Sequence, residues 1–276
     1  MKQYKNIKKK RTSRYNIEAL ARGLEVLELF TAEKSTLSLS EIVNTLNLNK
    51  STTFRLLSTL ESIGYLERES DNRRYYPSLK VLQLGFTAIN RQEVRQVARP
   101  YLERLSQETG ETVSLCVLNG IDVIYIDRIR NRAIVGVVLD IGSHVPAHCT
   151  SMGKVLLADL PDEELNKLLE QKELIQYTKH TITSRKDLYS ELLKVRKNGY
   201  AVCDGELAIG LIAAGAPIRN GSQKTIAAIN ISGSVSSIST QRLKQEIIPA
   251  VIKTANQISM ALGYISDTNQ DKGIAS

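Results

Sequence analysis

The chain has 276 residues, of which 42% are hydrophobic and 24% are charged, and this length suggests about two domains. It contains no run of about 18 apolar residues that could span a bilayer, and its basic N-terminus lacks the apolar stretch of a signal peptide. The 3 cysteines are too few, too widely spaced and odd in number for a disulfide framework. We therefore expect a cytoplasmic, reduced protein.

The positive charge is concentrated in an N-terminal arm, residues 1–15. Within residues 1–14 there are seven cations and no acid, which accounts for nearly all of the net charge of +8. A basic arm before a folded segment favours contact with a polyanion, because each neutralised phosphate releases counterions. A disordered, solubilising tail is an equally good interpretation of these residues.

Residues 16–77 predict three helices and a hairpin. Asn16 is the expected cap of the first helix, whose inward stripe would be Ile17, Leu20, Leu24, Val26 and Leu27. Ser40 is the expected cap of the second helix, which would bury Ile42, Val43 and Leu46. The third runs from about Lys50 to Ile63 and ends at Gly64. The hairpin turns at Asp71–Asn72, and the whole pattern is typical of a winged helix-turn-helix.

The third helix has a polar face that suits DNA. If Leu56, Leu57, Leu60 and Ile63 face inward, the other face carries hydroxyls and cations with no acid before Glu61. Arg55 is the best candidate for a bidentate contact with guanine, and the hairpin tip suits phosphate or the minor groove. The predicted DNA-binding residues are Arg11, Arg14, Lys50, Ser51, Thr52, Thr53, Arg55, Thr59, Arg73 and Arg74. A sensor or scaffold module that makes only protein contacts is the alternative.

Residues 78–92 predict a linker helix with an apolar face that could self-associate, and residues 93–264 predict a second domain. This domain begins with a helix that Pro100 should kink or break. Strands over 112–142 and 200–233 then flank a helical block, and a helix over about 238–262 precedes a polar tail, residues 265–276. The order predicts an α+β domain with one antiparallel sheet and does not fit a Rossmann alternation.

The tetrad Ser151-Met152-Gly153-Lys154 is an S-x-x-K at the start of a predicted helix. A Ser–Lys hydrolase needs a neutral lysine, proton-relay groups and an oxyanion hole, and the partner motifs of such enzymes are absent. A helix N-terminus that binds an anion through backbone N–H groups is the favoured interpretation.

Two further clusters have alternative explanations. His144, His148 and Cys149 lie on a loop with no adjoining carboxylate, which is weak support for a metal site. Asp127, Arg128 and Arg130 end a predicted strand. They favour a surface ion pair over an arginine that reaches a carboxylate ligand.

Several long blocks, in order, resemble the IclR family of bacterial transcriptional regulators from about residue 16 to 263. They include "ALARGLEVLELF", "LSLSEIVNTLNLNKSTTFRLLSTLESIGYLER", "GSHVPAHCTSMGKVLLADLPDEEL" and "RKNGYAVCDGEL". The resemblance implies a winged helix-turn-helix and a GAF-like effector domain in a non-enzymatic regulator without a cofactor. It also implies palindromic operators, a homodimer or dimer of dimers, and a small carboxylate effector. The segment 134–158 is most similar to the branch that governs aromatic-acid catabolism.

The resemblance also assigns effector residues. Ser151 and Met152 match carboxylate-binding positions, and Cys203 stands where family members often have an aspartate, which would leave the pocket less repulsive to anions. The implied effector-binding residues are Ile134, Val145, Ser151, Met152, Cys203, Asp204, Ala213, Asn230 and Ser232.

Overall fold

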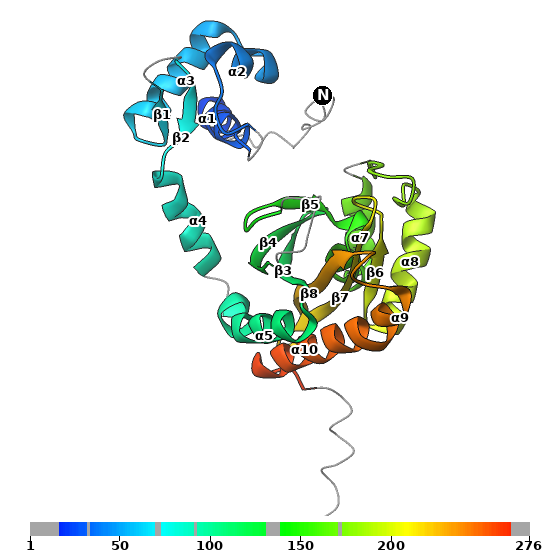
Figure 1. Cartoon of the computed structure of the whole chain (residues 1–276). Coiled ribbons are helices and arrows are strands. Elements are labelled where there is room, and N and C mark those ends of the chain that lie inside the picture. Colours follow the sequence, from blue (N-terminus) through cyan, green and yellow to red (C-terminus); the bar gives the residue numbers. More distant parts are fainter. Residues whose placement is uncertain are drawn as a thin grey trace, which may run out of the picture. The chain divides into compact units, whose positions relative to one another are not determined.

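The computed structural model of the chain describes residues 17–31, 34–69, 73–90, 93–130, 139–170 and 173–265. The basic arm with Arg11 and Arg14, the cap Asn16, the hairpin turn at 71–72, Ile134 and the tail from residue 266 lie outside these ranges. The chain divides into two compact units, residues 1–91 and 92–276, and each is described by itself (Figure 1).

The first unit is the predicted winged helix-turn-helix. Its elements are α1 (Glu18–Glu28), α2 (Leu39–Leu46), α3 (Lys50–Ser62), β1 (Leu66–Arg68) and β2 (Tyr75–Pro77). The two strands pair antiparallel, and their buried residues Leu66 and Tyr75 close a core that includes Val26, Ile42 and Leu57. Gly64 has a φ of +77° directly after α3, as expected of a residue that ends a helix.

The cap of α2 is Ser38 and not Ser40. The Ser38 hydroxyl accepts from the Glu41 N–H, and the Glu41 carboxylate accepts from the Ser38 N–H at 2.7 Å. This reciprocal capping box places Ser40 inside the first turn, because Glu41 stands three residues after the true cap.

Several apolar residues that were expected inside the unit are exposed. Ile17, Leu20 and Leu24 are 67%, 62% and 53% exposed, because α1 enters the core only through its last turn. Ile63 is 48% exposed where the chain leaves α3 for β1. Val43, Leu46 and Leu56 are half-buried. The helix α4 (Lys80–Asn90) follows, with Leu82 and Leu84 exposed.

The second unit is built on the predicted antiparallel sheet. The strand order is β5-β4-β3-β8-β7-β6, with β3 (Thr112–Asn119), β4 (Asp122–Ile129), β5 (His144–Pro146), β6 (Ala201–Asp204), β7 (Leu211–Arg219) and β8 (Thr225–Ser234). The third strand was expected over 133–142, but β5 begins at His144 and residues 139–142 are not strand.

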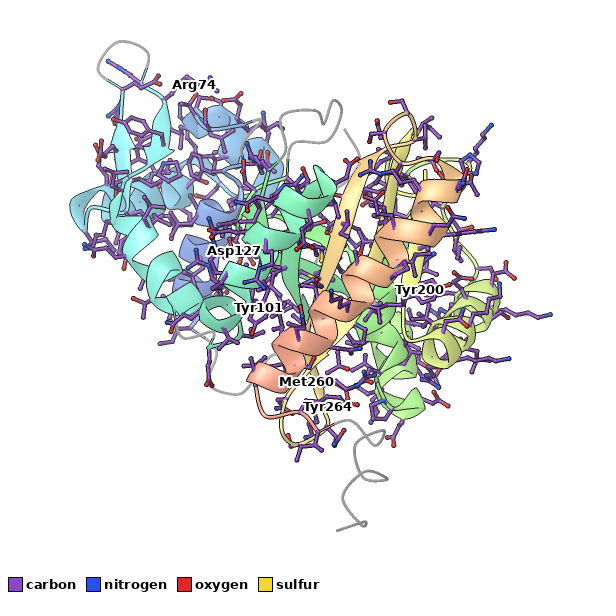
Figure 2. The ribbon with its side chains drawn as sticks, turned by 60° about the horizontal axis from the view of Figure 1, so that its bottom comes forward. Arg74, Tyr101, Asp127, Tyr200, Met260 and Tyr264 are labelled. Carbon is purple, nitrogen blue, oxygen red and sulfur yellow. The ribbon has the colours of Figure 1, made fainter. Side chains whose placement is uncertain are left out.

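Helices cover both faces of this sheet (Figure 1). On one face α5 (Glu93–Thr109) and α10 (Ile248–Ala261) pack against the apolar residues of β3, β7 and β8. Figure 2 shows α10 in front of the sheet on this face. On the other face lie α6 (Ser151–Ala158), α7 (Asp162–Glu170) and α8 (Arg185–Asn198). Pro100 does not break α5, which runs through it.

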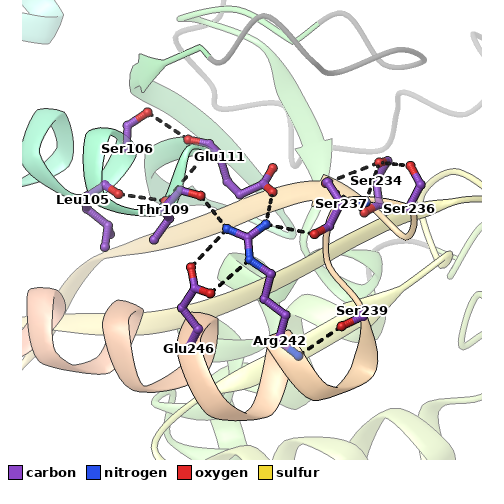
Figure 3. Close-up of polar contacts among 10 residues, drawn as sticks. All are labelled: Leu105, Ser106, Thr109, Glu111, Ser234, Ser236, Ser237, Ser239, Arg242 and Glu246. Atoms are coloured by element: carbon purple, nitrogen blue, oxygen red, sulfur yellow. Dashed lines mark hydrogen bonds and ion pairs between the residues drawn. The ribbon is translucent and has the colours of Figure 1, made fainter.

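The C-terminal helix is anchored at its start by one arginine. The short α9 (Thr240–Arg242) continues through a π-helical turn (Leu243–Ile247) into α10. Arg242 donates to the Glu111 carboxylate at 2.6 Å and to the Thr109 carbonyl at 2.5 Å (Figure 3). It therefore connects this helix to the junction between α5 and β3. None of the helices in the described ranges has the length and apolarity that a membrane crossing needs.

Candidate functional site

A small cavity lies on the face of the sheet that α6 covers, and its floor consists of two cross-strand rows. In one row Arg128 of β4 pairs with Ser114 of β3, which pairs with Asn230 of β8. In the neighbouring row Ser232, Ala213 and Cys203 of β8, β7 and β6 are in register. Residues two apart on a strand share a face, so Asn230 and Ser232 bring both rows to the same cavity.

The N-terminus of α6 forms the roof. Thr150 caps the helix by accepting from the Gly153 N–H at 3.1 Å. A Cβ at Gly153 would lie 2.2 Å from the Ala147 carbonyl oxygen, and one at Gly215 would lie 3.0 Å from the Ser151 backbone. Gly153 therefore lets the helix pack against the turn that precedes it, and Gly215 of β7 lets the start of the helix approach the sheet. The first N–H groups of a helix lack intrahelical partners and carry its positive dipole.

The remaining walls come from the segment after β6 and from β4. Glu206, Leu207 and Leu211 line one side, and Tyr125 and Leu139 line the other. The cavity volume is about 30 Å³, which is enough to hold ordered water.

Unpaired polar atoms distinguish this cavity from a larger surface groove. Ser151 Oγ, Asn230 Oδ1, Glu206 Oε2 and Arg128 Nε are all buried without a hydrogen-bond partner among the described residues. An unsatisfied buried polar group costs about 1–3 kcal/mol, so four around one cavity indicate a ligand or ordered water.

The larger groove, of about 540 Å³, lies where α6 and α8 end. Its arginines already have partners there, Arg196 with Asp162 and Arg219 with Asp159. The smaller cavity is therefore the better candidate for a binding site.

Lys154 is buried beside this cavity as an ion pair. Its side chain is 1% exposed, and Nζ lies 2.5 Å from Glu206 Oε1 and 3.8 Å from Glu191. Burial on its own lowers the pKa of Lys154, but the acidic groups around it outweigh burial and leave that pKa raised. The lysine is therefore an ammonium, which cannot take the proton of Ser151 as a Ser–Lys nucleophile requires.

Cys203 borders the same pair as a neutral thiol. Burial raises the pKa of Cys203 well above its ordinary value; Lys154 acts in the opposite direction, and the Glu206 carboxylate raises the pKa further. Glu206 lines the cavity together with Cys203, and Lys154 balances the charge of its carboxylate. That Cys203 makes the pocket less repulsive to anions stays a prediction.

The predicted surface ion pair among Asp127, Arg128 and Arg130 is wrong. Asp127 is buried on the α5 face, where it pairs with Arg99 at 2.6 Å and Arg95 at 3.4 Å. Arg130 pairs with Asp140. Arg128 points to the other face of the sheet, where burial lowers its pKa but an arginine remains charged.

The structure brings five of the nine predicted effector residues to the cavity: Ser151, Cys203, Ala213, Asn230 and Ser232. Val145 and Met152 are buried in the core under α6 and do not line it. Asp204 is exposed at the end of β6, because it points to the opposite side of the strand from Cys203. After it, Gly205 has a φ of +66°, and Glu206 lines the cavity instead.

The predicted effector set omits eight lining residues, namely Tyr125, Arg128, Leu139, Cys149, Thr150, Glu206, Leu207 and Leu211. Of these, only Arg128 belonged to a cluster for which contact with a carboxylate ligand was an alternative interpretation. In the motif "CTSMGK", Cys149 and Thr150 directly precede the helix that forms the roof. This position in the motif could have predicted that both residues line the cavity.

The loop histidines have other environments. His148 is buried, and its Nε2 lies 3.1 Å from the Ile175 carbonyl oxygen. In the described ranges no group of three or more His, Cys, Asp or Glu side chains could hold a metal ion.

The outward face of α3 carries half of the predicted DNA-binding residues. Lys50, Ser51, Thr52, Arg55 and Thr59 are exposed, and the first turn has no acid. Asn49 caps this helix by accepting from the Thr52 N–H at 2.7 Å. Phe54, which was not predicted, is 50% exposed beside them.

Two residues of the DNA-binding prediction have structural roles instead. Thr53 is fully buried and donates to the Asn49 carbonyl at 3.1 Å, because it lies on the inner side of α3. Arg74 pairs with Glu41 at 3.0 Å and donates to the Thr36 carbonyl at 2.9 Å, so it holds β2 against the start of α2. Arg73 is exposed.

Comparison with known families identifies both units. Residues 19–70 match the IclR helix-turn-helix domain, and residues 86–260 match the bacterial transcriptional regulator IclR C-terminal domain. The chain belongs to the IclR family. It is a DNA-binding transcriptional regulator and not an enzyme.

Similar proteins of known identity agree with this assignment. The chain is 32% identical to the HTH-type transcriptional regulator XynR of Escherichia coli K12, over 90% of this chain and 98% of XynR. It is 32% identical to the Pca regulon regulatory protein of Pseudomonas putida, over 87% and 82% of the two chains. The crystal structure of an IclR homologue from Microbacterium hydrocarbonoxydans in complex with 4-hydroxybenzoate matches with a TM-score of 0.76 and 26% identity, over 88% of this chain and 98% of that one.

Proposed function

We propose that this cytoplasmic regulator binds its operator through α3 and the hairpin β1–β2, and that a small carboxylate in the cavity under α6 controls that binding. The observation that carries the proposal is the set of unpaired buried atoms around the cavity, to which Ser151, Asn230, Glu206 and Arg128 contribute. The N-terminus of α6 and the arginine both attract an anion. The 4-hydroxybenzoate bound by the Microbacterium homologue is an acid of this kind.

Such a ligand needs more room than about 30 Å³. Binding therefore requires that side chains closing the cavity move, among which Leu139 and Leu207 are apolar and half-buried.

The direct test is a screen of aromatic and aliphatic acids against the full chain. We expect at least one acid to raise the thermal midpoint and to change the affinity for duplex DNA, because a ligand that binds only the folded state stabilises it. Ser151→Ala should reduce this shift, and Ser222→Ala, in an exposed loop, should leave it intact. The absence of any shift across the panel would exclude the cavity as an effector site.

We further propose that the chain acts as a homodimer or dimer of dimers on a palindromic operator. Exposed apolar side chains at the start of α1 (Ile17, Leu20) and on α4 (Leu82, Leu84) support this, because exposed apolar side chains that gather together favour association. Sedimentation of the double variant Leu82→Lys, Leu84→Lys should show a smaller species than the wild type, and an unchanged mass would remove α4 from the interface.

A further inference from the structure

The cavity has opposite chemical character at its two ends. Arg128 enters from β4 and Glu206 from the segment that follows β6, and these strands are separated by β3, β8 and β7 in the sheet. Neighbouring strands lie about 4.8 Å apart. The two side chains therefore reach the cavity from opposite sides, and a bound molecule meets a cation at one end and a carboxylate at the other.

Arg128 is available to an anion from outside the protein. The neighbouring acid, Asp127, faces α5 and is occupied by Arg99 and Arg95. The Arg128 guanidinium lies 5.8 Å from the centre of the Tyr125 ring, and its Nε has no hydrogen-bond partner among the described residues. An arginine held on an aromatic ring, without a carboxylate, matches the planar geometry of a ligand carboxylate.

Glu206 provides a hydrogen-bond acceptor at the other end of the cavity. Its Oε1 accepts from Lys154 at 2.5 Å, whereas its Oε2 is buried without a partner. An ionised carboxylate can only accept hydrogen bonds, so this end requires a donor on the ligand. Since Lys154 already balances the charge of Glu206, a neutral donor such as a hydroxyl fits better than a second cation.

The charges of the cavity also limit the charge of the ligand. Arg128 and Glu206 are the only charged side chains among the described residues that line it, and the Lys154–Glu206 pair is neutral as a unit. The net positive charge is therefore that of Arg128 alone, which one carboxylate balances. Leu139, Leu207 and Leu211 contribute apolar walls.

We propose that the effector is a hydroxy monocarboxylic acid with an apolar body, whose carboxylate pairs with Arg128 and whose hydroxyl donates to Glu206 Oε2. This inference rests on the proposed effector function of the cavity. It is more specific than that function, because it assigns a carboxylate-binding side chain and a hydroxyl acceptor.

The experiment measures binding of matched acids to the full chain by calorimetry. The pairs are 4-hydroxybenzoate with benzoate, 6-hydroxyhexanoate with hexanoate, and 3-hydroxybutyrate with butyrate, and terephthalate serves as the dicarboxylate. At least one hydroxy acid should bind about tenfold more tightly than its partner, a difference that a buried acceptor left unpaired can produce. Terephthalate should bind more weakly than that acid.

Substitutions then test the contributions of Arg128 and Glu206, at the two ends of the cavity, one at a time. Arg128→Gln should weaken every acid that binds by about tenfold or more, whereas Arg130→Gln, an exposed arginine of the same segment paired with Asp140, should change none. Glu206→Gln should reduce the preference for the hydroxy acid. If that variant does not fold, the wild-type preference within each pair still tests the same contact.

Two results overturn the inference and leave the proposed function standing. The first is that carboxylates bind, but no hydroxy acid binds more tightly than its partner without the hydroxyl. The second is that Arg128→Gln, like Arg130→Gln, leaves the affinity for every acid unchanged. The failure of every carboxylate to bind overturns the proposed function itself.

Discussion

Tyr125 and Arg128 face the same side of the sheet, although a regular strand would place residues three apart on opposite sides. The register explains this, because Cys116 pairs with Tyr125 and Leu115 with Asp127, so that Ile126 is an extra residue. Ile126 and Asp127 both face α5. This bulge therefore directs Arg128 into the cavity and leaves the neighbouring acid on the other face.

Replacing Arg55 tests the DNA-reading face of α3. We expect Arg55→Ala to lose about 1–3 kcal/mol of binding free energy at the operator and to relax its specificity, as the loss of a base contact does. The measurement is anisotropy on the duplex that the wild-type protein protects. Thr53→Ala is the control, because Thr53 is buried and its loss should change unfolding but not base preference. An unaltered footprint and affinity in Arg55→Ala would remove this residue from the readout.

Deleting residues 1–14 tests the basic arm. Each cation that neutralises a phosphate contributes about 0.9 to the slope of log affinity against log salt. The deletion should weaken binding at low salt and flatten this slope, and the slope is measured from titrations at several salt concentrations. A slope equal to that of the full chain would mean that the arm makes no phosphate contact.

The order and type of the elements could be predicted from sequence, because helical periodicity, caps and Asn-Gly turns are local signals. The floor of the cavity was partly predictable, since Asn230 and Ser232 follow the alternation of an uninterrupted strand. Arg128 and Glu206 could not be placed. A bulge at Ile126 and a positive φ at Gly205 reverse the side to which the following residues point, and a periodic pattern of side chains does not reveal such local departures from regular strand geometry. The role of Arg74 depends on Glu41, which is remote in the chain.

Acid should loosen the start of α2. Hydrogen bonds from the Ser38 backbone and side chain, and then Arg74, hold the pKa of Glu41 below its ordinary value of 4.5. A group with a lowered folded pKa contributes stability above its unfolded pKa and loses it as the pH falls through the folded value. Below about pH 4.5 the wild type should therefore lose unfolding free energy that Glu41→Gln already lacks. Urea titrations of both proteins between pH 3 and 7 measure this, and curves that remain parallel would contradict it.

The start of α6 should not tolerate a side chain at Gly153. A Cβ there would meet the Ala147 backbone at 2.2 Å, so Gly153→Ala should destabilise the second unit by about 1–3 kcal/mol, as overpacking does. Gly23→Ala is the matched control in α1, where a Cβ meets nothing within 4 Å and alanine should stabilise the helix by about 0.5–1 kcal/mol. Opposite signs in urea unfolding support the close packing of α6, and a neutral Gly153→Ala would refute it.

Asp127, which lies on the face of β4 opposite the cavity, should stabilise the folded state. Asp127 is 1% exposed and lies 2.6 Å from Arg99, so Asp127→Asn weakens a charge-assisted hydrogen bond between β4 and α5. Such bonds contribute about 1.5–3 kcal/mol, and we expect a loss of this size in the unfolding free energy from urea titration. Glu103→Gln removes the other acid that pairs with Arg99, but this acid is 49% exposed and should cost less than about 1 kcal/mol. Equal losses in the two variants would show that Asp127 anchors β4 no better than a surface carboxylate does.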